Sequence, residues 1–191
     1  MKNIRTEETN EQREQFVKVS NVNNKPLVRV YFNLRTEERE DKMGDEPKTY
    51  TVHIADFIER ASDKTTALDV AKEEVIEQIE AYDTSSAVNG FLLNGSVEWI
   101  DIELRMKLCS RTLPEEKKAG KTSTVLWLGN KPYELPIETI EQIMHEIEIY
   151  AKACLDVTNR HKAKVLTLSD VSALVAYDYT AGYPEKLSFN I

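Results

Sequence analysis

The sequence predicts an α+β fold in which antiparallel hairpins pack with one long helix and two or three shorter helices. Short runs rich in β-branched and aromatic residues, several of them joined by Asn and Gly, indicate hairpins. A segment near the C-terminus keeps apolar residues at helical spacing for many turns. Hydrophobic residues make up 41% of the chain and charged residues 30%, which is typical of a globular protein with a core.

The sequence of the first part of the chain predicts an N-terminal arm followed by a wide antiparallel hairpin. Residues 1–15 are charged and lack hydrophobic period, so we expect a mobile N-terminal arm without secondary structure. Residues 26–34, PLVRVYFNL, predict a strand, and residues 49–54, TYTVHI, predict its antiparallel partner. Between them, residues 35–48 are nearly all charged and indicate a long exposed connection.

A first helix and a tight hairpin are expected next. Thr66 is a suitable N-cap for a helix that reaches Tyr82, because apolar residues recur between them at steps of three and four. Residues 87–99 contain two Asn-Gly pairs around the apolar run FLL, a pattern that predicts strand, turn and strand.

A second helix and a second hairpin are expected after these. Asp101 is a good N-cap for a helix through Leu113, and Pro114 either ends that helix or begins a new turn. Residues 124–128 and 131–135 predict another hairpin, with Pro132 at an edge position. Both tryptophans fall within or beside these hairpins, and core packing explains them: Trp99 and Trp127.

The longest element is a helix that begins near Pro136 and presents one apolar face as far as His161. Ser169 is expected to cap a last short helix, and an extended tail follows. The predicted organisation is an arm at 1–15, a strand pair with its charged connection and a helix at 16–84, and an α+β domain at 85–191. The last two parts could also form one compact unit.

The charge distribution argues against nucleic-acid binding. The net charge of −8 resides in residues 49–191, because residues 1–48 carry equal numbers of acidic and basic side chains. An acidic body without a basic stripe cannot neutralise many phosphates. The N-terminus lacks the apolar run of a signal peptide, and no apolar stretch approaches a membrane span. We therefore expect no nucleic acid, no membrane and a cytoplasmic or virion-associated location.

No catalytic, cofactor-binding or metal-binding residues are predicted. The two cysteines, Cys109 and Cys154, have no zinc-ligand or CxxC spacing. Cys154 and His161 lie seven residues apart on the long helix, about 10 Å along its axis, which is too far for a nucleophile and its base. The sequence HEIEI around His145 lacks the second histidine of a zinc protease, and no phosphate-binding glycine motif occurs.

The tail YDYTAGYP contains the residues that we single out as candidates for contact with a partner: Tyr177, Asp178, Tyr179 and Tyr183. Each tyrosine ring offers apolar area together with a hydroxyl group. The alternative interpretation, favoured by about two to one, is that these rings attach the C-terminal segment to the rest of the domain.

The order VNGFLLNGSVEWID, LWLGNKPYELP, CLDVTNRH and YDYTAGYP resembles an uncharacterised family of short phage and prophage proteins encoded among virion or tail genes. The resemblance covers roughly residues 80–184 and rests on spaced aromatic residues and turns. It implies a viral structural or assembly setting and supplies no site residues.

The sequence thus favours a noncatalytic phage or prophage accessory protein, associated with tail or virion, that acts through protein–protein contacts and needs no cofactor. One alternative is a small enzyme that uses Cys154 or His161. Another is an acidic protein that mimics nucleic acid and binds a basic partner. Self-association is left open by the sequence, although exposed edges of the short hairpins would allow strand pairing between copies.

Overall fold

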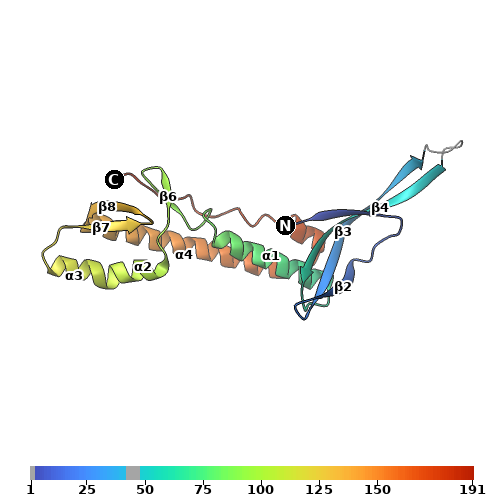
Figure 1. Cartoon of the computed structure of the whole chain (residues 1–191), viewed down its shortest axis with the longest axis horizontal. Helices are drawn as coiled ribbons and strands as arrows, with labels where there is room; N and C mark the ends of the chain where they lie inside the picture. The colour runs from blue at the N-terminus through green and yellow to red at the C-terminus, as the bar shows by residue number, and fades with distance from the viewer. Residues whose placement is uncertain (1–2, 42–47) are drawn as a thin grey trace. The chain divides into compact units, whose positions relative to one another are not determined.

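The computed structural model describes residues 3–41 and 48–191. It confirms the α+β class: a four-stranded antiparallel sheet and smaller hairpins accompany a long helix and shorter ones (Figure 1). The chain divides into two compact units. Unit 1 comprises Met1–Ile79 and His161–Tyr179, and unit 2 comprises Glu80–Arg160 and Thr180–Ile191.

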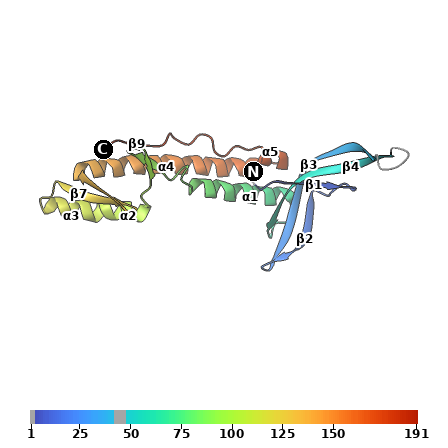
Figure 2. The same cartoon turned by 45° about the horizontal axis from the view of Figure 1, so that its top comes forward.

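Unit 1 is built on an antiparallel sheet with the strand order β1-β4-β3-β2, whose strands lie side by side in Figure 2. The strands are β1 (Arg5–Thr9), β2 (Phe16–Val22), β3 (Lys25–Asp41) and β4 (Lys48–Ala61). A tight turn joins β2 to β3 at Asn23 and Asn24, which both adopt positive φ angles. Asparagine tolerates this conformation better than most residues, so the turn suits a two-residue hairpin.

Two expectations about the N-terminal region are corrected. Arg5–Thr9 form a strand paired with β4, where we expected an arm without structure. Strand β3 continues to Asp41 and pairs with β4 as far as Lys48, where we expected an exposed connection to begin at residue 35. The rest of that predicted connection, residues 42–47, lies outside the described residues. Charged side chains are compatible with these strands because their backbones pair while most of the side chains are exposed, and Glu7, which is partly buried, pairs with Arg13 and Arg29.

The two faces of this sheet are both covered. Val28, Val30 and Ile58 are buried on one face, on the side of helix α1 (Ala67–Asp83). The other face carries the buried cluster of Tyr31, Ala55 and Phe57. The link between β1 and β2 joins opposite edges of the sheet and passes over this second face. This explains why β3, a strand rich in charged residues, is buried on both sides at its centre.

Helix ends in unit 1 follow the expected chemistry with one correction. Thr66 caps α1 as predicted, because its hydroxyl oxygen accepts a bond from the Asp69 backbone N–H at 3.1 Å. The short helix α5 (Val171–Val175) is capped by Asp170, whose carboxylate accepts from the Ala173 N–H at 2.8 Å. The prediction of Ser169 as the cap is therefore wrong by one residue. Aspartate and serine are similar caps, so their order in the chain cannot separate them.

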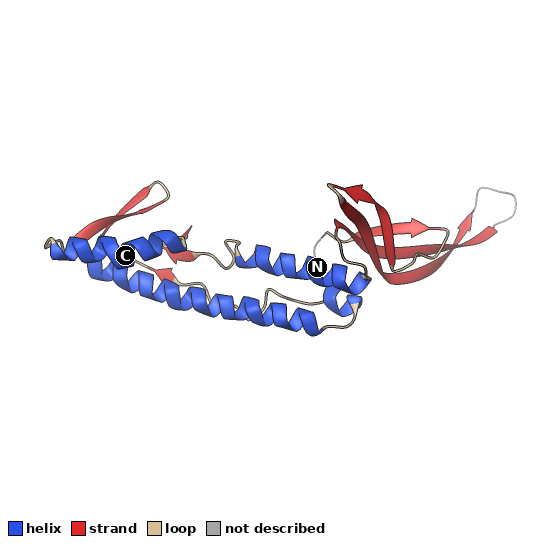
Figure 3. Cartoon of the chain, turned by 90° about the horizontal axis from the view of Figure 1, so that it is seen from below, coloured by secondary structure: helices blue, strands red, loops and turns tan. Residues whose placement is uncertain are grey.

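Unit 2 contains the two predicted hairpins. Strands β5 (Phe91–Leu93) and β6 (Ser96–Glu98) pair across a turn at Asn94 and Gly95, and β9 (Ser188–Phe189) adds to β5 in parallel. Strands β7 (Ser123–Leu128) and β8 (Lys131–Pro136) form a separate two-stranded sheet. Figure 3 distinguishes these strands, in red, from the helices, in blue.

The helices of unit 2 extend further than expected. Asp101 caps α2 (Ile102–Lys107) as predicted, accepting from the Leu104 N–H at 2.9 Å. A π-helical stretch, η1 (Leu108–Thr112), then leads into α3 (Leu113–Lys118), so Pro114 begins a new turn of helix. The long helix α4 (Ile137–Thr167) begins close to the predicted start, but Pro136, which we expected in its first turn, is the last residue of β8. The last residues of α4 belong to unit 1.

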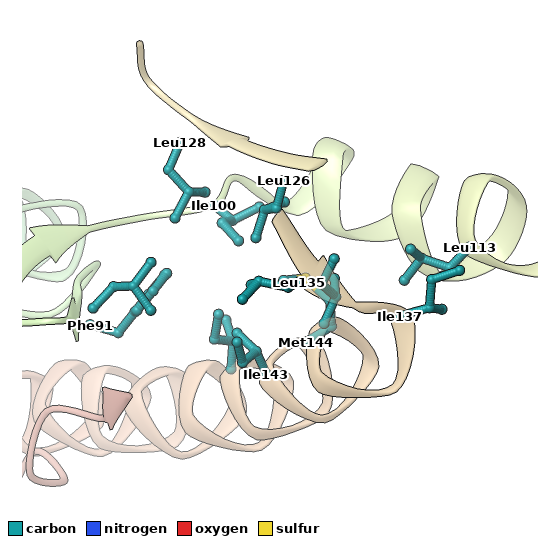
Figure 4. Packing of buried hydrophobic residues seen from close by; sticks show 12 residues of the cluster. Phe91, Ile100, Leu113, Leu126, Leu128, Leu135, Ile137, Ile143 and Met144 are labelled. Atoms are coloured by element: carbon teal, nitrogen blue, oxygen red, sulfur yellow. The ribbon is translucent and has the colours of Figure 1, made fainter. Parts of the chain in front are cut away.

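The core of unit 2 lies between the β7–β8 sheet and the first half of α4. Figure 4 shows Leu126, Leu128 and Leu135 turned toward Ile143 and Met144. All are buried and form one cluster with other apolar residues: Phe91, Leu93, Ile100, Leu113, Ile137, Ile140 and Ile147. Only one face of the β7–β8 sheet takes part in this packing, because its side chains alternate between inward and outward positions.

Candidate functional sites

Cys154 lies in the interior of unit 2 and is 3% exposed. It packs with Val88 and Tyr150, and the Tyr150 hydroxyl donates to the Val88 carbonyl oxygen at 3.0 Å. Burial raises the pKa of the Cys154 thiol and also that of Tyr150. A nucleophilic cysteine needs an accessible thiolate. This cysteine is instead held as a neutral, enclosed thiol.

His161 is engaged with a residue of the tail. Its Nδ1 lies 2.7 Å from the Tyr177 hydroxyl, and the two rings meet edge to face at 5.7 Å between centroids. Cys154 and His161 are seven positions apart on the continuous helix α4, or about 10 Å along its axis. A nucleophile and its base must lie about 3 Å apart. The two residues of the enzyme hypothesis therefore have separate partners.

The tail tyrosines of unit 1 have internal partners. Tyr177 bonds to His161, and burial raises the pKa of its phenol. Tyr179 is 4% exposed, and its hydroxyl donates to Gln78 Oε1 at 3.4 Å. Asp178, between them, has an exposed side chain. Of the four candidates for partner contact, Tyr179 thus has almost no surface to offer.

Tyr183 performs a similar role in unit 2. Its ring meets Tyr82 edge to face at 5.3 Å, and its hydroxyl lies 2.9 Å from Thr158 Oγ1. Thr158 in turn donates to Asp83 Oδ1 at 2.6 Å. Because the Thr158 proton is directed to the carboxylate, Tyr183 is the donor in the bond between the two hydroxyls. This polar chain, enclosed by aromatic rings, holds the tail against α4.

A pocket of about 170 Å³ lies in unit 1 beside the β-bulge of β3. Its basic lining residues are Arg13, Arg35 and His53, and none of the residues that line it is acidic. Each arginine already faces a carboxylate. Arg13 Nε donates to Glu7 at 2.8 Å, and Arg35 lies 3.7 Å from Asp56. Burial by itself would raise the pKa of the Asp56 carboxyl. Hydrogen bonds from Asn33 and Thr6, together with the charge of Arg35, outweigh it and hold this pKa below its usual range. The pocket therefore offers little uncompensated charge to an anion.

Two arginines hold elements together inside the units, and the sequence did not single them out. Arg60 on β4 donates to Glu74 at 2.9 Å and to Glu77 at 2.5 Å, which fixes α1 to the sheet. Arg105 on α2 is 4% exposed and donates to Glu148 of α4 at 2.6 Å. A charge buried this deeply needs a partner. Spacing along the chain gives no signal for either pair.

The largest departure from the expected burial is at Trp127. We expected it in the core, but it is 58% exposed, on the outward face of β7 next to Val125, which is 44% exposed. Trp99, in contrast, is partly buried against the core of unit 2, as expected. The alternation in TVLWL contained the signal: if Leu126 and Leu128 point inward, Val125 and Trp127 must point outward.

Unit 2 also exposes apolar side chains on its helices. Ile102 and Met106 of α2 are 58% and 63% exposed, four positions apart on one face of the helix. Within residues 3–41 and 48–191, no group of three or more metal-ligating side chains comes together. None of the helices in the described part of the chain is long and apolar enough to cross a membrane.

No protein-family model, no curated protein and no solved structure matches this chain.

Proposed function

We propose that the chain is a noncatalytic accessory protein of a phage or prophage, associated with tail or virion, that acts through protein–protein contacts. The phage setting is supported by the sequence resemblance in residues 80–184. The contact role is supported by the α2 surface, defined by Ile102 and Met106, because two large apolar side chains exposed on one helix face are better suited to a partner than to water.

The absence of catalysis in this proposal is supported by how the reactive side chains are used. Cys154 is enclosed by apolar and aromatic neighbours, and His161 is bonded to Tyr177. The described geometry adds no observation in favour of the two alternatives, the small enzyme and the acidic nucleic-acid mimic. The affinity of a nucleic-acid mimic for a basic protein would depend strongly on salt concentration. The affinity of the proposed apolar contact would not.

The test is the presence of the full chain in phage material. Particles and assembly intermediates are purified from cells that produce the phage or induced prophage encoding the protein, and the chain is quantified by mass spectrometry. We expect it in at least one of these fractions. Its repeated absence from both would remove the proposal.

A pair of variants assigns the contact to the α2 surface. Replacing Ile102 and Met106 together by serine should reduce recovery in the particle or intermediate fraction by about tenfold, since losing two apolar contacts weakens binding by more than about 1.4 kcal/mol. Leu155→Ser is the matched control, because Leu155 is also exposed on a helix of unit 2, at 48%. Equal losses for both variants would exclude the α2 surface as the contact.

A further inference from the structure

The β7–β8 sheet has two edges that differ chemically. In the observed register Trp127 is opposite Pro132, and Ser123 is opposite Pro136. Proline has no backbone N–H, so these two pairs cannot exchange hydrogen bonds with each other. The bonds of the ladder must therefore run through the alternate positions of β7, which are Thr124, Leu126 and Leu128.

This alternation determines which backbone N–H and C=O groups each outer edge exposes. On β7 the backbone groups of Ser123, Val125 and Trp127 point away from β8, so the outer edge carries three N–H donors and three carbonyl acceptors. On β8 the outward positions are Pro132, Glu134 and Pro136, which leave one N–H among three residues. Two prolines thus protect the edge of β8 against pairing, and nothing of that kind protects β7.

The edge of β7 is open and uncharged. Over the part of the chain that the structure describes, β8 is the strand that pairs with β7. The sequence STVLWL contains no charged residue, although 30% of the chain is charged. Natural edge strands are usually protected by charge, proline or a bulge, and an edge without these devices is a site for strand addition.

We propose that the open edge of β7 pairs with β7 of a second copy of this chain. The strands run antiparallel about a twofold axis at Val125, which joins the two hairpins into one four-stranded sheet. In this register Val125 is opposite its own counterpart, and Ser123 is opposite Trp127 in both directions. All three pairs fall at outward-pointing positions, so each can exchange its N–H and C=O groups with the partner strand.

Side-chain chemistry makes a second copy the occupant that fits. Residues directly opposite each other share a face of the sheet. The large exposed ring of Trp127 therefore meets the smallest side chain of the strand, Ser123, twice, and Val125 meets Val125. No like charges are opposed, which matters for two copies of a chain with net charge −8. The contact is the symmetric, self-complementary kind that closes a dimer.

The first experiment measures self-association of the full chain by sedimentation velocity from about 1 μM to about 1 mM, since a short strand pair is a small interface and should be weak. Val125→Pro removes an N–H that β8 does not use, so the hairpin is retained and the open edge is blocked. Val125→Thr is the control, because it keeps the N–H and the β-branched shape. We expect the native chain and V125T to form dimers and V125P to remain monomeric.

Other outcomes overturn the proposal. A native chain that stays monomeric throughout the range excludes the second copy as occupant, even if an added extended peptide binds the edge. A V125P variant that dimerises like the native chain places the interface elsewhere. Circular dichroism checks that V125P is folded. If it is not, Trp127→Lys replaces it, because that side chain is largely exposed and its charge would face the partner strand.

A second experiment tests the register. Cys109 is exposed, so Cys109→Ser removes the competing thiol, and Val125→Cys or Glu134→Cys is added to that variant. Opposed residues of a hydrogen-bonded pair have Cα atoms about 5.5 Å apart, within reach of a disulfide, whereas two Glu134 positions would be separated by three strand spacings, about 14 Å. We expect oxidative cross-linking at least about tenfold faster at position 125. Equal rates at the two positions would contradict the register.

Discussion

The sheet of unit 1 and the β7–β8 sheet of unit 2 differ in the side chains that their edge strands carry. In unit 1, the outer strand β1 carries Arg5, Glu7 and Glu8. Ion pairs link it to its neighbour β4 and also to β3, as in the 2.9 Å contact of Glu8 with Arg39 of β3. In unit 2, two prolines protect β8 and uncharged residues occupy β7. The comparison is between an edge strand that carries charge, which disfavours pairing with another chain, and an edge strand that carries neither charge nor proline.

The largest expected effect concerns the inward face of β7. Leu126→Ala should lower the free energy of unfolding by about 2–5 kcal/mol, because it leaves a cavity against α4. Val125→Ala, one position away on the outward face, should cost less than about 1 kcal/mol at concentrations where the chain is monomeric. Urea denaturation followed by circular dichroism compares them. Similar losses would mean that both faces of this sheet support the fold.

The two cysteines test whether the interior of unit 2 is closed. Cys109 is exposed and Cys154 is buried, so native alkylation of Cys154 should be slower by about a hundredfold, equivalent to about 2.7 kcal/mol. Although Cys109 is exposed as a residue, partial desolvation of its sulfur, together with the nearby Glu148 and Glu141, raises the pKa of its thiol. Its alkylation rate should therefore keep rising with pH beyond the ordinary titration range of a free thiol. A Cys154 that reacts as fast as Cys109 would favour the enzyme hypothesis over the noncatalytic one.

The next prediction compares a largely buried arginine of unit 1, Arg60, with a more exposed one, Arg39. Arg60→Ala should lower the free energy of unfolding by about 2 kcal/mol, because it removes the hydrogen bonds to Glu74 and Glu77 and leaves the largely buried Glu74 carboxylate without its cation. Arg39→Ala breaks the exposed pair with Glu8 and should cost less than about 1 kcal/mol. Chemical denaturation measures both. If the Arg39 variant had the lower free energy of unfolding, the edge ion pairs would stabilise this sheet more than the ion pairs that attach it to α1.

The smallest effect concerns the cap of α5. Asp170→Ala should cost about 1 kcal/mol, because the Ala173 N–H loses its acceptor. Ser169→Ala, at the position that the sequence favoured, should change the free energy of unfolding by less than about 0.5 kcal/mol. The same denaturation assay distinguishes them, and a larger loss for Ser169 would restore the sequence-based assignment of the cap.

Sequence reasoning succeeded where neighbours along the chain determine the outcome. The caps Thr66 and Asp101 and the turn at Asn94 and Gly95 depend on a few consecutive residues. It failed for β1, whose charged sequence RTEET has no strand signal and becomes a strand by pairing with residues about fifty positions away. Strand β2 was also missed, although the turn at Asn23 and Asn24 offered a hairpin signal.

The candidate sites follow the same rule. Helical geometry alone separated Cys154 from His161, because both lie on one helix. The partners of the tail tyrosines could not be predicted, since Tyr179 meets Gln78 and Tyr183 meets Thr158 only after distant segments pack. The exposure of Trp127 was available from the alternation of β7 but was outweighed by the usual preference of tryptophan for buried positions.

The sequence by itself determined the fold class, the long helix α4 and the tight hairpins, because periodicity and turn chemistry act over a few residues. The tertiary structure decided which strand edges are covered, which arginines are buried and where each reactive side chain finds its partner. These depend on pairing between distant segments, for which the order of residues carries no local signal.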